Sequence, residues 1–204
     1  MNNLHVVLDI DNTLIDSINE QDYKIIKYEI RPPDLYYQEA HMLIWKRPHL
    51  PDFLNFLNEH VQYVSIWTNG NKSWLNFIFN NLIAKYINPR KIVFLFSIDY
   101  STPIMIRNDH FSGKIYVKEL KKILNNNVTL RNTVLIDDNY YNCYFNRNNS
   151  IPIKKYHVLH EKNKKFNELK NIKEILLSLK ATQDVSQTMG KVYESIGNYE
   201  KLFN

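Results

Sequence analysis

The stretch of sequence that decides the fold is His5-Val6-Val7-Leu8-Asp9-Ile10-Asp11-Asn12-Thr13-Leu14, near the start of a chain of 204 residues. Its first four residues form a short apolar run that is too continuous for a half-exposed strand and is typical of a buried parallel strand. Three more runs of this kind lie at residues 61–67, 91–96 and 133–136. Helical patterns lie between them, at 50–60 with Pro51 in its first turn and at 74–86. We therefore predict an α/β fold in which flanking helices cover a parallel sheet.

Two stretches interrupt this alternation. Residues 22–45 contain apolar and aromatic segments on either side of Arg31-Pro32-Pro33-Asp34, so we interpret them as two extended segments about a proline turn. This pattern predicts a small β insertion over residues 15–45. Residues 97–114 are polar and irregular, and they predict a flap over the sheet edge, with a plain long loop as the alternative.

The C-terminal segment 181–204 follows a helical pattern at 166–179 and predicts a helical appendage to a domain of residues 1–180. Its apolar residues recur at a spacing of three and four, which places one stripe along a helix. The stripe comprises Val185, Met189, Val192, Tyr193, Ile196, Tyr199, Leu202 and Phe203. Two glycines weaken this helix, so the stripe needs a surface to cover it. We predict that it packs back on its own domain or contacts a second copy of the chain in a homodimer.

Composition limits the class of protein. Hydrophobic residues make up 44% of the chain, which is enough for one sizeable core. The longest apolar stretch, 92–96, is far shorter than the roughly 20 residues of a membrane span, so we expect no membrane span and no signal peptide. The single cysteine, Cys143, excludes an internal disulfide and favours an intracellular location, cytoplasmic or nuclear. The net charge of +5 is concentrated in the lysine-rich segment 154–180, which is typical of a solvated face but would also attract an acidic partner.

Acidic and hydroxyl residues follow the predicted strands at the points where these end. They are Asp9 and Asp11 after the first strand, Thr68 and Asn69 after the second, and Asp137 and Asp138 after the fourth. Each pair alone is equally typical of a helix cap or a turn, but their order along the chain, with Lys118 between them, favours a functional site. The carboxyl ends of parallel strands meet in one crevice, so these side chains should share it. Clustered carboxylates repel each other without a cation, and an all-oxygen ligand set suits Mg²⁺, so we predict a metal-dependent phosphoryl site.

On these residues the sequence resembles the haloacid dehalogenase superfamily, and within it the RNA polymerase II C-terminal-domain phosphatases and their small, NLI-interacting-factor-like relatives. The resemblance to this branch rests on Lys46-Arg47-Pro48-His49-Leu50-Pro51-Asp52-Phe53-Leu54, Tyr116-Val117-Lys118-Glu119-Leu120 and Asn148-Asn149-Ser150-Ile151-Pro152-Ile153. It covers about residues 4–180 and implies a Rossmann-like sheet without a large cap domain. Phe96-Ser97-Ile98-Asp99-Tyr100 replaces an Arg-Glu-Ser-Cys pattern of the branch, which weakens any inference of serine selectivity in polymerase repeats.

The resemblance also implies an aspartyl-phosphate mechanism. Asp9 would be the nucleophile, and Asp11 would serve as general acid and then general base. Thr68, the amide of Asn69 and Lys118 would bind the phosphoryl group. Mg²⁺ would be bound by the Asp9 carboxylate, the Asp11 main-chain carbonyl and Asp138, with Asp137 reaching it through water.

Neither insertion is long enough to form a large lid, so we expect an open crevice that suits a phosphoprotein bound as an extended phosphopeptide. Aromatic residues of the first insertion could line that crevice or simply attach the insertion to the sheet. They are Tyr23, Tyr28, Tyr36, Tyr37 and Trp45. We predict a Mg²⁺-dependent protein serine/threonine phosphatase. The alternatives are a polynucleotide or small-metabolite phosphatase on the same site, with nucleic acid the less favoured partner, and a non-catalytic protein-binding module like the import-receptor relatives.

Overall fold

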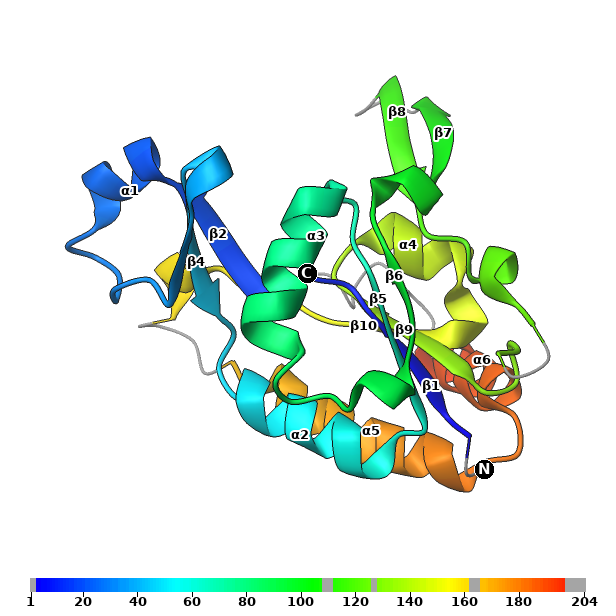
Figure 1. Cartoon of the computed structure of the whole chain (residues 1–204). Coiled ribbons are helices and arrows are strands. Elements are labelled where there is room, and N and C mark those ends of the chain that lie inside the picture. The colour runs from blue at the N-terminus through cyan, green and yellow to red at the C-terminus, as the bar shows by residue number, and fades with distance from the viewer. Residues whose placement is uncertain (1–2, 108–111, 126–127, 162–165, 197–204) are drawn as a thin grey trace.

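The computed structural model describes residues 3–107, 112–125, 128–161 and 166–196, without the side chains of residues 191–196. Within these ranges the centre of the fold is a five-stranded parallel sheet of order β10-β9-β1-β5-β6 (Figure 1). The strands are β1 (His5–Leu8), β5 (Tyr63–Trp67), β6 (Ile92–Phe96), β9 (Thr133–Asp137) and β10 (Ser150–Pro152). In the middle strand β1, Leu8 lies level with Ile66 of β5 and Ile136 of β9. The predicted α/β fold with a parallel sheet is confirmed, and β10 is a strand that the apolar runs did not reveal.

Helices flank this sheet. They are α2 (Leu50–His60), α3 (Lys72–Ile78), α4 (Tyr140–Phe145), α5 (Glu168–Ala181) and α6 (Val185–Ile196). Helix α2 has the predicted bounds, with Pro51 in its first turn, where the proline removes no helical hydrogen bond. The helix predicted at 74–86 begins at Lys72, and it continues beyond Ile78 as a π-helical turn, η2 (Phe79–Ile83). None of the helices that the structure describes is long and apolar enough to cross a membrane.

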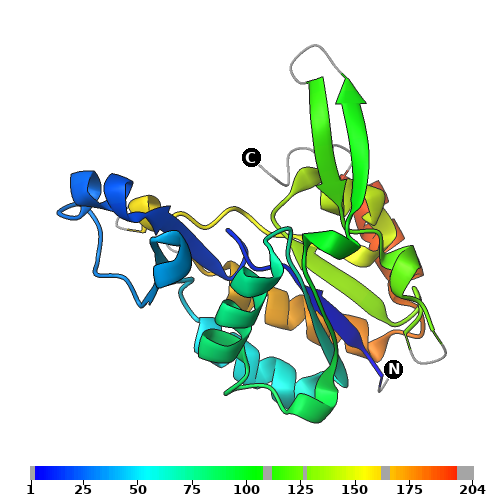
Figure 2. The ribbon, with the colours of Figure 1, turned by 45° about the horizontal axis from the view of Figure 1, so that its top comes forward.

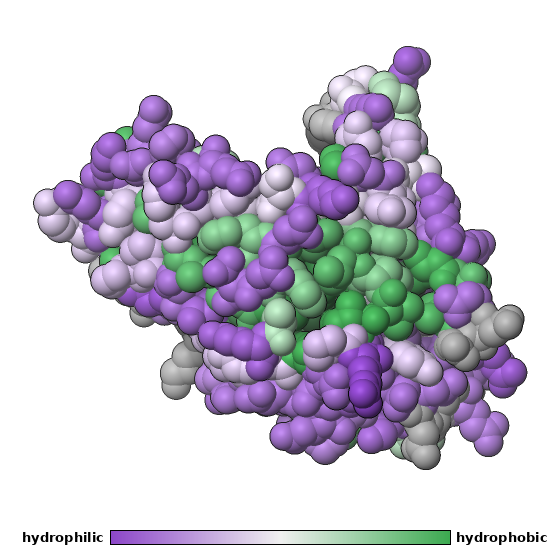
Figure 3. All heavy atoms as spheres, viewed as in Figure 1, coloured by the Kyte–Doolittle hydropathy of each residue, from purple (hydrophilic) through white to green (hydrophobic). Residues whose placement is uncertain are grey.

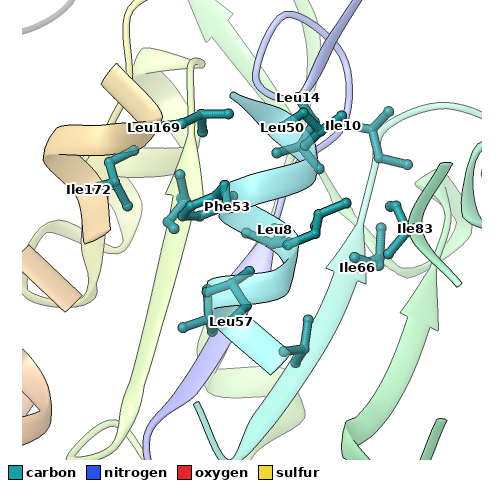
Figure 4. Packing of buried hydrophobic residues seen from close by; sticks show 14 of the residues in the cluster. Leu8, Ile10, Leu14, Leu50, Phe53, Leu57, Ile66, Ile83, Leu169 and Ile172 are labelled. Atoms are coloured by element: carbon teal, nitrogen blue, oxygen red, sulfur yellow. The ribbon is translucent and has the colours of Figure 1, made fainter. Parts of the chain in front are cut away.

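The main core lies between the sheet and helices α2, α3 and α5 (Figure 4). Leu8 of β1 packs there with Phe53 of α2 and Ile172 of α5. Because side chains alternate along a strand, Val7 faces the other way, into a smaller cluster with Leu120 of the short helix η5 (Leu120–Ile123). The central strands are therefore buried on both faces, which explains their continuous apolar sequence.

The insertion after β1 is a small antiparallel sheet of order β2-β4-β3. Its elements are β2 (Ile15–Asn19), α1 (Glu20–Ile26), β3 (Leu35–Tyr37) and β4 (Met42–Lys46). The prediction of an extended segment on the N-terminal side of the prolines is wrong, because α1 occupies it. Asn19 accepts a hydrogen bond from the Asp22 main-chain N–H at 2.9 Å, and Lys24 pairs with Glu20 one turn earlier. This cap and this ion pair stabilise a helix in spite of the β-branched residues.

The segment after β6 forms a regular hairpin instead of the predicted irregular flap. Strands β7 (Thr102–Arg107) and β8 (Ser112–Val117) pair antiparallel, with Ile104 opposite Ile115. Figure 2 shows that this hairpin stands out from the body of the protein. In the structure Ile104 and Ile106 alternate with more exposed residues, but the apolar Met105 between them hides this alternation in the sequence.

Strand β6 is one of the two edge strands of the sheet, and its Val93 is 39% exposed. Figure 3 shows apolar residues gathered beside α3 on this side of the molecule. At the C-terminal end, Val185 and Met189 of α6 are buried in the main core. The side chains of the remaining stripe, from Val192 to Phe203, lie outside the described residues. The division into a domain of residues 1–180 and an appendage of residues 181–204 therefore stays a prediction.

Candidate active site

The carboxyl ends of β1, β5 and β9 lie side by side, and the predicted acidic and hydroxyl residues meet there. Asp9 directly follows β1, and its main-chain N–H donates to the Ile136 carbonyl at 3.0 Å. Thr68 follows β5, and its N–H donates to the Phe96 carbonyl at 2.9 Å. Asp137 is the last residue of β9. The parallel register therefore brings together residues that are more than a hundred positions apart in the sequence.

Lys118 lies between two of these carboxylates. It follows the last residue of β8, is 1% exposed, and its Nζ donates to Asp9 Oδ1 and, at 2.7 Å, to Asp137 Oδ2. Burial alone would lower the pKa of Lys118, but the charges of Asp137 and Asp9 outweigh it and raise that pKa. Lys118 is therefore a fixed positive charge beside Asp9 over the whole physiological pH range.

A group of carboxylates fits a divalent cation. Oxygen atoms of Asp9, Asp137 and Asp138 lie within 4.8 Å of one another, and all three residues are buried. Burial and the charge of Asp9 raise the pKa of Asp138 to about 8, and burial raises that of Asp137 to about 6 against the opposing charge of Lys118. One ammonium group does not neutralise three carboxylates, and oxygen ligands are those that Mg²⁺ prefers. The Asp11 carboxylate is not in this group, so its predicted contact with the metal involves only the main-chain carbonyl.

The Asp11 carboxylate is held by two donors. The Thr68 hydroxyl donates to Oδ2 at 2.9 Å, and the indole N–H of Trp74 donates to Oδ1 at 2.9 Å. The Gly70 N–H donates in turn to Thr68 Oγ1 at 2.9 Å. Burial raises the pKa of Asp11, and the hydrogen bonds from Thr68 and Trp74 oppose part of that rise. Sequence reasoning missed Trp74, because its place in an apolar helical pattern indicates only core packing.

Thr13 and Asn69 make contacts that support the loops around the site. Thr13 Oγ1 donates to Asp138 Oδ1 at 3.2 Å and accepts from the Asp138 N–H at 3.1 Å, so it braces the loop after β9. The Asn69 side chain accepts from the Ser101 hydroxyl at 2.7 Å and donates to the Tyr116 carbonyl at 2.9 Å. These contacts tie the end of β5 to the hairpin, so only the main-chain N–H of Asn69 fits the predicted role in phosphate binding.

Helix α4 and its C-cap residue contribute two asparagines that the sequence analysis missed. Asn142 accepts from the Lys118 N–H and donates to Asp137 Oδ2, both at 3.0 Å. Asn146, one turn later, accepts from the Leu120 N–H at 3.0 Å and donates to the Lys118 carbonyl. Together they fix the main chain around Lys118. Two asparagines four residues apart after the acid pair were the available signal.

A cavity of about 440 Å³ opens beside Asp11. It lies between the insertion and the start of α3 and is lined by Asp11, Ser17, Tyr37, Ala40, Met42, Asn69, Gly70, Asn71 and Trp74. Of the five aromatic residues singled out in the insertion, Tyr37 lines this cavity. Trp45 and Tyr23 pack against each other in a separate core cluster. Tyr28 and Tyr36 are exposed on the surface.

Comparison with known proteins gives a family match over most of the chain. A family model described as NLI interacting factor-like phosphatase matches residues 4–186. No curated protein matches the sequence.

Two solved structures have a similar fold. A variant of the fission yeast RNA polymerase II CTD phosphatase Fcp1, bound to beryllium fluoride, matches with a TM-score of 0.50 and 16% identity over 96% of this chain and 56% of the other. A structure of Fcp1 described as an essential RNA polymerase II CTD phosphatase matches with a TM-score of 0.50 and 16% identity over 97% and 55%. The chain thus spans little more than half the length of these structures, and the likeness to them is one of fold.

Proposed function

Because the chain belongs to the NLI interacting factor-like phosphatase family, we propose that it hydrolyses phosphate monoesters on proteins through an aspartyl-phosphate at Asp9. The observation that carries this proposal is the arrangement around Lys118, which is buried between Asp9 and Asp137 at the ends of parallel strands. A carboxylate fixed by a buried ammonium group is oriented for attack and is kept apart from water.

The proposed reaction has two steps. In the first, an Asp9 oxygen attacks phosphorus, the bond from phosphorus to the leaving oxygen breaks, and that oxygen takes a proton from Asp11. The raised pKa of Asp11 favours the protonated form that this step requires. In the second, the Asp11 carboxylate takes a proton from the attacking water, the bond from phosphorus to Asp9 breaks, and inorganic phosphate leaves. Asp9 and Asp11 are then in their starting states.

Three groups would bind the phosphoryl oxygens: the Lys118 ammonium, the Thr68 hydroxyl and the main-chain N–H of Asn69. Mg²⁺ would be held by the carboxylates of Asp9 and Asp138 and by the Asp11 carbonyl, with Asp137 reaching it through water. When bound, the cation offsets the negative charge of the carboxylates and of the phosphate. Support for this ligand set comes from the carboxylate group of Asp9, Asp137 and Asp138.

A phosphoprotein is the substrate class we favour, with phosphoserine or phosphothreonine in an extended segment. The cavity beside Asp11 is bounded by small β elements and carries no large cap in the described part of the chain. The Fcp1 structures are described as phosphatases of the polymerase C-terminal domain, a phosphorylated protein segment. An intracellular location, cytoplasmic or nuclear, stays a prediction that rests on the single cysteine.

Trapping of the intermediate tests the proposal. The purified protein with Mg²⁺ and p-nitrophenyl phosphate is quenched in acid and digested, and mass spectrometry should find phosphate on the peptide that contains Asp9. Asp9→Asn should abolish both turnover and trapping, because an amide does not form the acyl phosphate. Asp52→Asn, on the exposed side of α2, is the control and should retain both. Turnover of Asp9→Asn within tenfold of wild type would contradict the assignment.

The substrate class is tested separately by comparing phosphopeptides, a phosphorylated oligonucleotide and sugar phosphates. The highest kcat/KM should be found with phosphoserine or phosphothreonine peptides. A preference for the oligonucleotide or for a sugar phosphate would instead support the alternative phosphatases. No hydrolysis of any of these substrates would support a protein-binding module.

A further inference from the structure

Trp74 holds the carboxylate that the proposed reaction uses as its acid. Its indole N–H donates to Asp11 Oδ1, while the Thr68 hydroxyl donates to Oδ2, both at 2.9 Å. We infer that Trp74 is a positioning residue, which orients Asp11 for proton transfer to the leaving oxygen. This inference rests on the proposed function and adds to it a residue that no sequence motif indicated.

The chemistry of the two donors differs. An indole N–H donates and has no acceptor, so the Asp11 lone pair that it occupies does not carry the proton. The Thr68 hydroxyl is the group proposed to turn toward a phosphoryl oxygen when substrate binds. The hydrogen bond from the Trp74 indole would then be the one that still holds the Asp11 carboxylate. The proton to be transferred would sit on another lone pair of that carboxylate.

The structure holds the indole ring in place from several sides. Asn71 caps α3 and accepts from the Trp74 main-chain N–H at 2.8 Å, and the Trp74 residue is 8% exposed. The Tyr37 ring of β3 lies 5.4 Å from the indole ring, between centroids. A Cβ atom on Gly70 would clash with Cδ1 of the indole, so the absence of a side chain there permits this position. A ring that is confined in this way directs the carboxylate at little cost in conformational entropy.

Trp74 also lines the cavity beside Asp11, so its replacement would alter substrate contacts as well as proton transfer. Two aryl esters separate these effects. Phenyl phosphate and p-nitrophenyl phosphate have rings of similar size and the same phosphoryl group. The p-nitrophenolate ion is a weak base that leaves without a proton, whereas phenolate is a stronger base and gains more from an acid.

The test compares kcat/KM for the two esters, because this constant covers the steps up to departure of the leaving group. In Trp74→Phe, the ratio of kcat/KM for phenyl phosphate to that for p-nitrophenyl phosphate should fall about tenfold relative to wild type. This is a fraction of the about 10² to 10⁴ that general acid catalysis contributes. Loss of cavity contacts alone would lower both constants together and leave the ratio unchanged.

Phe77→Leu is the matched control. Phe77 lies on the same helix and packs on the same Tyr37 ring, with centroids 4.7 Å apart. Its variant should keep the wild-type ratio. Gly70→Ala is the second test variant, for use if Trp74→Phe does not fold, because a methyl group there would clash with the indole ring that contacts Asp11. It should lower the ratio in the same direction.

An unchanged ratio in the folded test variants, or an equal fall in Phe77→Leu, would overturn the inference. Wild-type protein that hydrolyses neither ester would instead overturn the proposed function. The two failures are therefore distinguishable.

Discussion

In the metal-free protein, Asp138→Asn is expected to raise the free energy of unfolding at pH 7. Asp138 is 7% exposed, and burial together with the charges of Asp9 and Asp137 raises its pKa from 3.8 to about 8. The unfolded chain ionises this carboxyl near its usual pKa, so folding requires proton uptake between these two values. Stability is therefore greatest at low pH and falls as the pH rises through this range. Each unit between the usual pKa of 3.8 and pH 7 costs about 1.4 kcal/mol, so Asp138 lowers the free energy of unfolding at pH 7 by about 4 kcal/mol.

Asparagine is a matched replacement, because its carbonyl oxygen can still accept the hydrogen bond that Thr13 donates to Asp138 Oδ1. Urea unfolding in excess chelator, followed by tryptophan fluorescence, should show a gain of up to about 4 kcal/mol at pH 7. At pH 4 most of the gain should vanish, because the carboxyl of the unfolded chain is then itself close to its usual pKa of 3.8 and folding requires little proton uptake. Added Mg²⁺ should stabilise the wild type more than the variant. Equal stability of the two proteins at pH 7, or the same gain at both pH values, would refute this reasoning.

Four further predictions concern the metal, the support of Lys118, the C-terminal helix and the oligomeric state. A chelator should abolish hydrolysis of p-nitrophenyl phosphate, Mg²⁺ should restore it, and Ca²⁺ should inhibit because its coordination is longer and more variable; undiminished turnover in excess chelator would contradict the ligand set. Asn142→Ala should lower kcat and reduce the free energy of unfolding by about 1 to 3 kcal/mol, since the Lys118 N–H loses its buried acceptor; an unchanged urea midpoint would disprove this support. Met189→Ala should cost about 2 to 5 kcal/mol in urea unfolding at unchanged kcat/KM, because the side chain is 4% exposed within the main core; no loss would place α6 outside the cooperative unit. Light scattering on the whole chain tests the predicted homodimer, and a monomeric mass would exclude it.

The centre of the sheet was predictable because strands β1, β5 and β9 are buried on both faces, and strands of this kind have continuous apolar sequences. Strand β10 was not predicted, because it has only three residues, one of them Pro152, and lies at the sheet edge. Helix α1 was not predicted, because its β-branched residues favour a strand. The cap of Asn19 on Asp22 and the ion pair of Glu20 with Lys24 stabilise the helix instead.

The acidic and hydroxyl residues of the candidate site were predictable because they lie at or just beyond the ends of strands whose neighbours are set by the parallel topology. The residues that hold these side chains in place were not predictable. Trp74 and Asn142 lie on helices at positions where the sequence pattern indicates only packing or solvent exposure. Their contacts with Asp11 and Asp137 depend on how each helix docks on the sheet, which no local pattern encodes.

The hairpin β7–β8 bears on how this scaffold could be redesigned. Thr102 pairs with Val117, so the excursion leaves and re-enters the body at one rung, directly before Lys118. Beyond the pair of Ile104 and Ile115, the outer rungs carry none of the residues assigned to the chemistry. This outer part of the hairpin can therefore be replaced by loops of varied sequence. The inner strand pairs would still hold Lys118 in place.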